Sequence, residues 1–218
     1  MIKISAFAAS CAAGNSHTAE MADRVADAIR KKAAEQGKNV EYERMTGADV
    51  RIDYCRYCIN CFTKGFCPLD SHDDCGMLKQ RILYCDIFLF GTPVYLWQMS
   101  GIAKSLLDRI SYWTHRFELI VKPCVTFSTT DTSRGREVPA ELTQLMSFTG
   151  AVMTDGGCST GISGMEKDPA EIAEKALALY RDPASGVSIF QQRAFLCRVI
   201  LTTTALSFRS FSCPRESP

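Results

Sequence analysis

Four closely spaced cysteines are the residues of this 218-residue chain that are best suited to chemistry. They follow the pattern Cys-x2-Cys-x2-Cys-x5-Cys and are Cys55, Cys58, Cys61 and Cys67, with Pro68 directly after the last of them. Thiolates three residues apart on a tight loop can point at separate irons of a cubane cluster, and a fourth thiolate closes the site. The pattern departs from the bacterial ferredoxin run only in its last gap. It predicts a [4Fe–4S] cluster bound by these four side chains.

Two other uses of these cysteines stay open. Zinc also binds four thiolates, although such sites usually come as two separated Cys-x2-Cys pairs. The thiols could also persist without a metal, and the nearby Cys75 could be a packing residue or a resolving thiol. The chain has eleven cysteines in all. In a reducing compartment, metal or redox chemistry is a commoner use for so many cysteines than disulfide bonds.

The turn after the first apolar run carries groups that suit a phosphate. Ser10, Asn15, Ser16 and Thr18 offer hydroxyl, amide and backbone donors where a helix is expected to begin, and His17 opens that helix. A helix N-terminus supplies unpaired N–H groups and a partial positive charge. The turn lacks Lys, Arg and the motifs of nucleotide triphosphatases and dinucleotide-binding folds. We expect a monophosphate held mainly by neutral donors; a capped helix turn without a ligand is the alternative.

Two further loops contain aromatic, hydroxyl and small residues. The loop at 92–97 follows the most apolar segment, and an isoalloxazine ring needs an apolar slot with aromatic faces. Tyr95 and Trp97 could provide those faces; the alternative is that they pack in the interior. The loop at 128–136 is rich in hydroxyl groups. The candidate binding residues of these two loops are Thr92, Pro93, Val94, Tyr95, Leu96, Trp97, Ser128, Thr129 and Thr130.

Strand and helix patterns alternate along the chain and must position these loops. Apolar or alternating runs predict strands at 2–9, 40–45, 86–91, 120–127 and 151–155. Apolar residues at helical spacing predict helices at 17–35, 76–83, 100–112, 139–148 and 168–180. This alternation predicts an α/β fold with a parallel sheet between two layers of helices. Ligands of such sheets bind beyond the carboxyl ends of the strands, so the three loops should meet at one edge.

One domain is expected over residues 1–183, and residues 53–76, called the cysteine segment below, form an insertion in it. Residues 184–218 fall outside the strand–helix pattern and are expected to form a C-terminal helical extension. Its apolar residues at helical spacing would pack on the same domain or on a sister subunit.

Charge and hydropathy exclude several classes of function. Lys and Arg total 25 and Asp and Glu total 24, so the formal net charge is +1, and no long basic run is present. Nucleic-acid binders need such a basic surface, so we expect no nucleic-acid partner. The chain shows no secretory signal and no apolar stretch long enough to span a bilayer. We therefore expect a cytoplasmic protein that does not bind membranes.

Several stretches, in order, resemble one known family. Phe90–Tyr95 followed by Lys104–Arg109 looks like the corresponding part of flavodoxin-like NAD(P)H-dependent FMN reductases, and Gly14–Thr18 is similar to their phosphate loop. Cysteines ahead of an Asp-Asp pair, here Asp73-Asp74, resemble the iron–sulfur flavoproteins within that group. The resemblance covers about residues 1–160.

The resemblance implies a flavodoxin-like three-layer sandwich whose five-stranded parallel sheet has the order 2-1-3-4-5. It also implies that the three loops bind FMN, the first around the phosphate and the second along the ring. NAD(P)H is the implied electron donor, and a ferredoxin-like redox partner protein or a small-molecule acceptor is the implied partner. A homodimer or homotetramer is implied as well.

We therefore expect an FMN-dependent oxidoreductase, linked to NAD(P)H or ferredoxin, with a [4Fe–4S] cluster beside the flavin that couples one- and two-electron steps. Two alternatives stay open. One is a cluster-free NAD(P)H-dependent FMN or quinone reductase. The other is a zinc-stabilised binding module without enzymatic activity.

Overall fold

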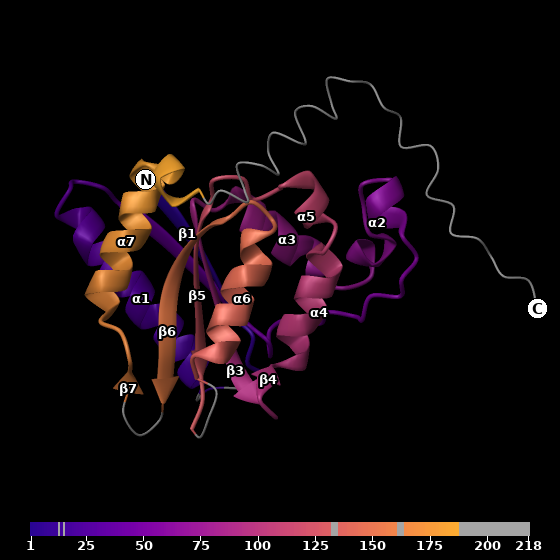
Figure 1. Cartoon of the computed structure of the whole chain (residues 1–218), viewed down its shortest axis with the longest axis horizontal. Helices are drawn as coiled ribbons and strands as arrows, with labels where there is room; N and C mark the ends of the chain where they lie inside the picture. Colours follow the sequence, from indigo (N-terminus) through magenta and orange to yellow (C-terminus); the bar gives the residue numbers. More distant parts are fainter. Residues whose placement is uncertain (13, 15, 132–134, 161–163, 188–218) are drawn as a thin grey trace, which may run out of the picture. The chain divides into compact units, whose positions relative to one another are not determined.

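Five parallel strands form the centre of the fold, which is given by a computed structural model that describes residues 1–187 except 13, 15, 132–134 and 161–163. Their order in the sheet is β2-β1-β3-β5-β6 (Figure 1). Numbered along the chain as parallel strands, this is the predicted order 2-1-3-4-5, which is the flavodoxin-like arrangement. The strands are β1 (Ile2–Ala8), β2 (Val40–Thr46), β3 (Ile87–Tyr95), β5 (Pro123–Thr129) and β6 (Val152–Thr160).

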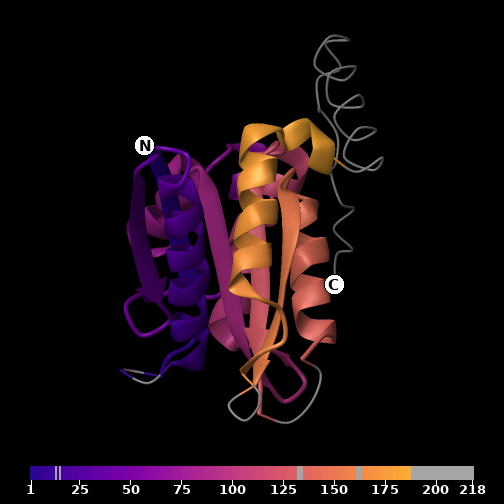
Figure 2. The same ribbon diagram turned by 90° about the vertical axis from the view of Figure 1, so that its left-hand side faces the viewer.

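Helices cover both faces of the sheet (Figures 1 and 2). Helices α1 (His17–Ala34) and α7 (Pro169–Arg181) lie on one face. Helices α3 (Cys75–Tyr84), α4 (Gly101–Ile110) and α6 (Glu137–Ser147) lie on the other face. The predicted three-layer sandwich is therefore confirmed, and each of these helices lies within a few residues of its predicted range.

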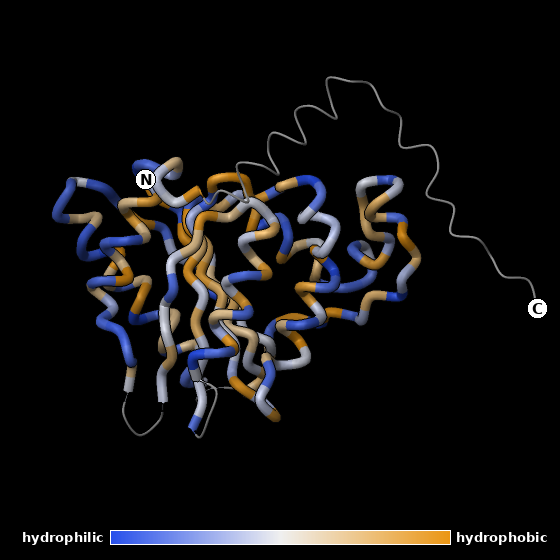
Figure 3. Tube along the Cα trace, in the orientation of Figure 1, coloured by the Kyte–Doolittle hydropathy of each residue, from blue (hydrophilic) through white to orange (hydrophobic). Residues whose placement is uncertain are grey.

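Strand β3 shows why the sheet needs two covering layers. Ile87 and Leu89 enter the core beneath α1 and α7, whereas Phe88 and Phe90 enter the core beneath α3, α4 and α6. All four side chains are fully buried. A parallel strand buried on both faces is expected to read as a continuous apolar run. Figure 3 shows the same result as hydrophobic colour along the central strands.

Two short antiparallel strands were not predicted. Strand β3 continues beyond Gly91 to Tyr95, and the chain then turns back as β4 (Gln98–Met99), which pairs with the end of β3. Strand β7 (Gly164–Met165) pairs with the end of β6 in the same manner. The loop predicted at 92–97 is thus a strand end and a hairpin, because Val94 and Tyr95 favour extended backbone.

The remaining elements are short. They are α2 (Asn60–Thr63) and the 3-10 helix η1 (Pro68–Ser71) in the cysteine segment, α5 (Trp113–Arg116) and the 3-10 helix η2 (Pro183–Gly186). Residues 1–187 form one compact unit. The predicted C-terminal helical extension lies, from residue 188 onward, outside the described residues. None of the described helices is long and apolar enough to cross a membrane.

Gly91 allows β3 and β5 to pair closely. A Cβ atom at this position would overlap the aromatic ring of Phe127, which is fully buried and has no room to move aside. By contrast, a Cβ atom at Gly101, the first residue of α4, would meet nothing within 4 Å.

We predict that Gly91→Ala lowers the free energy of unfolding by about 1–3 kcal/mol, because it overpacks the core. Gly101→Ala is the matched control and should leave stability unchanged or raise it slightly, since alanine restricts the unfolded chain more than glycine does. Urea denaturation of both variants measures the difference. Equal stability of the two variants would contradict this account of Gly91.

Candidate functional site

Buried hydroxyl groups join the three predicted loops at the carboxyl edge of the sheet. The Ser100 Oγ donates to the carbonyl of Ala9 at 2.6 Å, and the Thr92 Oγ1 accepts from the backbone N–H of Ser100 at 3.0 Å. On the other side of the first loop, the Oγ1 atoms of Thr18 and Thr129 lie 2.6 Å apart. The structure therefore brings the first loop into contact with both of the others, as the parallel sheet predicted.

The first loop ends at the N-terminus of α1. Ser16 caps the helix, and its Oγ accepts from the backbone N–H of Ala19 at 3.2 Å. The Oγ of the buried Ser10 accepts from the N–H of Ala12 at 3.3 Å. Gly14 has a φ of +88° and open space around its Cα, so the backbone can approach a ligand closely. These groups fit a phosphate seat built from neutral donors and the helix N-terminus. The predicted Asn15 lies outside the described residues.

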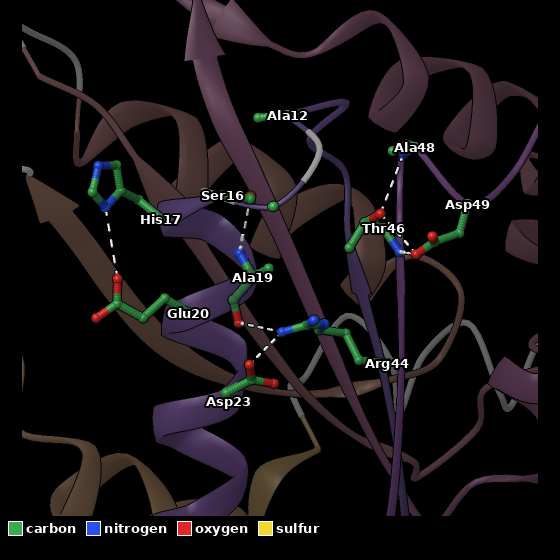
Figure 4. A pocket seen from close by; sticks show the side chains of 11 residues that line it. Ala12, Ser16, His17, Ala19, Glu20, Asp23, Arg44, Thr46, Ala48 and Asp49 are labelled. Atoms are coloured by element: carbon green, nitrogen blue, oxygen red, sulfur yellow. Dashed lines mark hydrogen bonds and ion pairs between the residues drawn. The ribbon is translucent and has the colours of Figure 1, made fainter.

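A cavity of about 690 Å³ opens beside this loop and extends toward the end of β2 (Figure 4). Several of its ionisable side chains contact one another: Arg44 contacts Asp23, and the Nδ1 of His17 lies 3.7 Å from the Glu20 carboxylate. Hydrogen bonds from the hydroxyl and backbone N–H of Thr46 hold the pKa of Asp49 below its ordinary value. Of the described residues that line the cavity, none comes from the second or third loop.

The second loop forms a tight hairpin whose tip is apolar and exposed. Leu96 and Trp97 have φ values of +46° and +65°, and Tyr95 pairs with Gln98, which defines a two-residue turn of type I′. The exposed fractions of Tyr95, Leu96 and Trp97 are 54%, 98% and 63%. Interior packing of these aromatic residues is therefore wrong, since more than half of each aromatic residue is exposed. Thr92 and Pro93 are buried and Val94 is partly buried.

Some of the predicted hydrogen-bond donors in the third loop already bond to other groups of the protein. The buried Ser128 donates from its Oγ to the carbonyl of Gly135 at 3.0 Å. The backbone N–H of Thr130 donates to the carbonyl of Ser159 at 3.0 Å, which ties the loop to β6. Thr129, which bonds to Thr18, is the residue of this loop that faces the first loop most directly.

The four predicted metal ligands differ in exposure. Cys55 and Cys58 are exposed, Cys61 is partly buried and Cys67 is buried. Burial raises the pKa of the Cys61 thiol, and the neighbouring thiols of Cys67 and Cys55 raise it further. Cys61 is therefore close enough to both Cys55 and Cys67 to be affected by them. Tyr57 and Ile59, on either side of Cys58, have φ values of +52° and +60°, so the segment turns sharply at this cysteine.

The cysteine segment packs at the far end of α4 from the three loops. The Phe62 ring lies 5.3 Å from the ring of His115, and the Arg116 Nη1 donates to the carbonyl of Gly65 at 3.2 Å. Figure 1 shows α2 near α5, whereas β4 and the strand ends lie at the opposite end of α4. The ten residues of α4 span about 15 Å. Within one chain, the segment is therefore about one helix length from the expected flavin edge.

A buried charge cluster holds the base of the cysteine segment, and the sequence pattern did not identify it as a unit. Arg109 contacts Asp73 and donates to Asp70 at 2.6 Å, and Lys79 lies 2.8 Å from Asp70. Burial acts to raise the pKa of Asp73, but hydrogen bonds from Arg109 and from two backbone N–H groups hold it below its ordinary value. The sequence features that could have revealed this cluster were the Asp73-Asp74 pair and Arg109. At the level of the sequence, both served only as evidence for the family resemblance.

This charge cluster is not a metal site. Among the described residues, Asp70, Asp73 and Cys75 are the group whose possible ligand atoms all lie within 4.8 Å of one another. Arg109 and Lys79 already neutralise both carboxylates. No three of the four predicted cysteines form such a close group in the part of the chain that the structure describes. Four thiolates around one zinc would lie about 4 Å apart, given Zn–S bonds of about 2.3 Å.

Comparison with known proteins adds independent information. The family model for NADPH-dependent FMN reductase matches residues 2–161. An iron–sulfur flavoprotein of Clostridioides difficile (strain 630) is 28% identical over 110 residues, which are 50% of this chain and 45% of that protein. An iron–sulfur flavoprotein of Archaeoglobus fulgidus is 30% identical over 95 residues, which are 44% of this chain and 41% of that protein. The matches thus span less than half the length of these curated relatives.

The fold is also similar to that of solved structures. One is the crystal structure of RosB with bound 8-demethyl-8-formylriboflavin-5'-phosphate, which matches with a TM-score of 0.62 and 13% identity. The match covers 100% of this chain and 93% of that chain. At this low identity, the likeness shows the fold alone.

The hairpin tip yields a test of backbone strain. Leu96 is fully exposed but holds a left-handed conformation, which costs non-glycine residues about 1–2 kcal/mol. We predict that Leu96→Asn raises the free energy of unfolding by up to about 1 kcal/mol, because asparagine tolerates this conformation.

Leu96→Ile is the matched control for this prediction. It keeps the apolar character but adds a β-branch, which the left-handed region disfavours strongly, so its stability should fall. Chemical denaturation of the flavin-free protein measures both changes. If both variants were equally stable, the strain at this position would not exist.

Proposed function

The chain belongs to the NADPH-dependent FMN reductase family, and we propose that it is a flavin oxidoreductase whose cysteine segment holds a [4Fe–4S] cluster. The observation that carries the second part is the cysteine segment itself. It contains four thiols within one short stretch of the chain. The neighbouring thiols of Cys55 and Cys67 both raise the pKa of Cys61. The two curated relatives named above are iron–sulfur flavoproteins, which supports the same assignment.

The loops at the carboxyl edge would hold the FMN. Ser10, Ser16 and Thr18 would surround its phosphate, together with the free N–H groups of the first turn of α1. Residues 92–97 would line the ring, with Tyr95 and Trp97 as aromatic faces. When bound, FMN supplies hydride and single-electron chemistry, and a cluster supplies single-electron transfer. The protein would contribute the position of both groups and hydrogen bonds to them.

Cys55, Cys58, Cys61 and Cys67 would ligate the cluster. The donor set fits, because four thiolates are the usual ligands of a [4Fe–4S] centre. Each of these thiolates would bind a different iron of the cluster. The four cysteines also lie in one short run, whereas four-thiolate zinc sites usually come as two separated Cys-x2-Cys pairs, which favours a cluster over zinc.

The distance between the two sites supports an oligomer. Since the length of α4 separates the cysteine segment from the flavin edge within one chain, we propose that electrons pass between the cluster of one chain and the flavin of another in a homodimer or homotetramer. NAD(P)H or a ferredoxin-like protein would be the donor, and a redox protein or a small molecule the acceptor. The many free thiols suit the reducing cytoplasm.

Anaerobic purification followed by metal and cofactor analysis tests the proposal. We expect bound FMN, together with about four irons and four sulfides per chain. Bound FMN without iron would support the cluster-free reductase, and the proposed cluster would be wrong. Zinc without flavin and without NAD(P)H oxidation would support the binding module.

A cysteine substitution separates the two cofactors. We predict that Cys58→Ser abolishes the broad visible absorption of the cluster but leaves FMN bound, because the two sites lie at opposite ends of α4. Cys11→Ser is the control, since Cys11 is an exposed thiol outside the cysteine segment; it should keep its iron. Absorption spectra and iron content measure both. Loss of iron and FMN together in Cys58→Ser would show that the segment is needed for folding.

A further inference from the structure

Arg109 contacts both ends of the chain segment that contains the four predicted ligands. Its Nη1 donates to the backbone carbonyl of Asp53, two residues before Cys55, at 3.1 Å. Its Nη2 donates to the Asp70 carboxylate, three residues after Cys67, at 2.6 Å. One guanidinium group therefore joins the two ends of the loop that contains Cys55, Cys58, Cys61 and Cys67.

Asp73 strengthens this closure. Its Oδ2 accepts from Arg109 and, at 2.9 Å, from the backbone N–H of Asp53. The neighbouring Asp74 accepts at 2.8 Å from the backbone N–H of Arg51. Carboxylates thus join the stretch before Cys55 to the stretch after Cys67. Arg109 lies at the centre of these contacts. Breaking a buried ion pair by removing one partner is strongly destabilising, so this closure should be rigid.

One N–H donor of Arg109, at Nε, is left without an acceptor among the described residues. The side chain of Arg109 is 1% exposed. Buried N–H groups are almost always paired, so an orphaned one points to a missing acceptor. Of the groups that act electrostatically on Arg109, Cys67 and Cys75 are the sulfurs. A sulfur-ligated centre at Cys67 would provide the acceptor that the Arg109 Nε lacks.

We propose that Arg109 is the positioning residue of the cysteine segment and that its charge and spare N–H stabilise the reduced state of the centre held there. The second half of this inference depends on the proposed cluster. The physical reason is that hydrogen bonds and positive charge near the sulfurs of an iron–sulfur cluster favour the more negative, reduced form. Arg109 would then raise the reduction potential as well as hold the loop.

Limited proteolysis tests the positioning role without any cofactor. Arg56 and Lys64 are exposed trypsin sites inside the segment. Arg109→Lys keeps the charge, but a lysine has all its donors on one nitrogen and cannot reproduce the two-nitrogen fork that contacts Asp53, Asp70 and Asp73. We predict that trypsin cleaves the metal-free variant at Arg56 or Lys64 at least about tenfold faster than the wild type. Arg81→Lys is the matched control, since Arg81 makes a surface ion pair with Glu43 at 2.7 Å; its cleavage rate should not change.

A redox titration of the reconstituted protein tests the second role. We predict a lower midpoint potential for the cluster in Arg109→Lys, which lacks the Nε–H donor, and an unchanged potential in Arg81→Lys. A residue that only supported the fold would leave the potential where it is. Unchanged cleavage together with an unchanged potential would overturn the inference.

Two further outcomes keep the test decisive. If Arg109→Lys does not fold, Asp70→Asn weakens the same closure while leaving Arg109 and Asp73 paired, and it should also speed cleavage within the segment. Unchanged cleavage in Asp70→Asn would then overturn the positioning role. If the wild type binds no iron after anaerobic reconstitution, the proposed function fails, but the proteolysis comparison still tests the positioning role.

Discussion

The parallel sheet is covered by helices on both of its faces, so a ligand can reach it only at an edge. This constraint places the loops after β1, β3 and β5 side by side, and buried hydroxyl contacts then fix their spacing. Helix α4 starts at this edge, where Ser100 bonds to Thr92, and ends beside the cysteine segment. The same layer of helices therefore both closes the core and separates the cysteine segment from the three loops.

The cysteine segment has little core of its own, and a charge cluster replaces that core at its base. Asp70 and Asp73 are balanced by Lys79 and Arg109, so the buried group is neutral as a whole. Buried charges are tolerated only when they are paired and hydrogen-bonded, which explains why the four residues occur together. The pairing also explains why a cluster of two carboxylates and the Cys75 thiol is not a cation site.

Unfavourable backbone conformations occur at both candidate sites. Leu96 and Trp97 in the hairpin, and Tyr57 and Ile59 beside Cys58, all have positive φ values without being glycine. All four side chains are also exposed. Left-handed conformations with large exposed apolar side chains lower stability and are not needed by the core, and such strain concentrates at binding and catalytic sites. The strain at these positions thus agrees with the roles proposed for the two loops.

Local patterns in the sequence were enough to predict the α/β fold class and the three loops, whereas the strand order came from the resemblance to a known family. The continuous apolar run at 87–90 identified a central strand, and Ser16 marked the start of α1. The spacing of the cysteines also indicated metal chemistry, because ligands close in sequence can meet on one loop. The hairpin at Leu96 and Trp97 was missed, since neither residue has the usual chemistry of a tight turn.

Only the tertiary structure revealed that Arg109 meets Asp53, Asp70 and Asp73, and that α4 separates the cysteine segment from the loops. These contacts join residues from 36 to 56 positions apart. Such pairing depends on how helices pack against the sheet, and no local pattern of residue types encodes that packing.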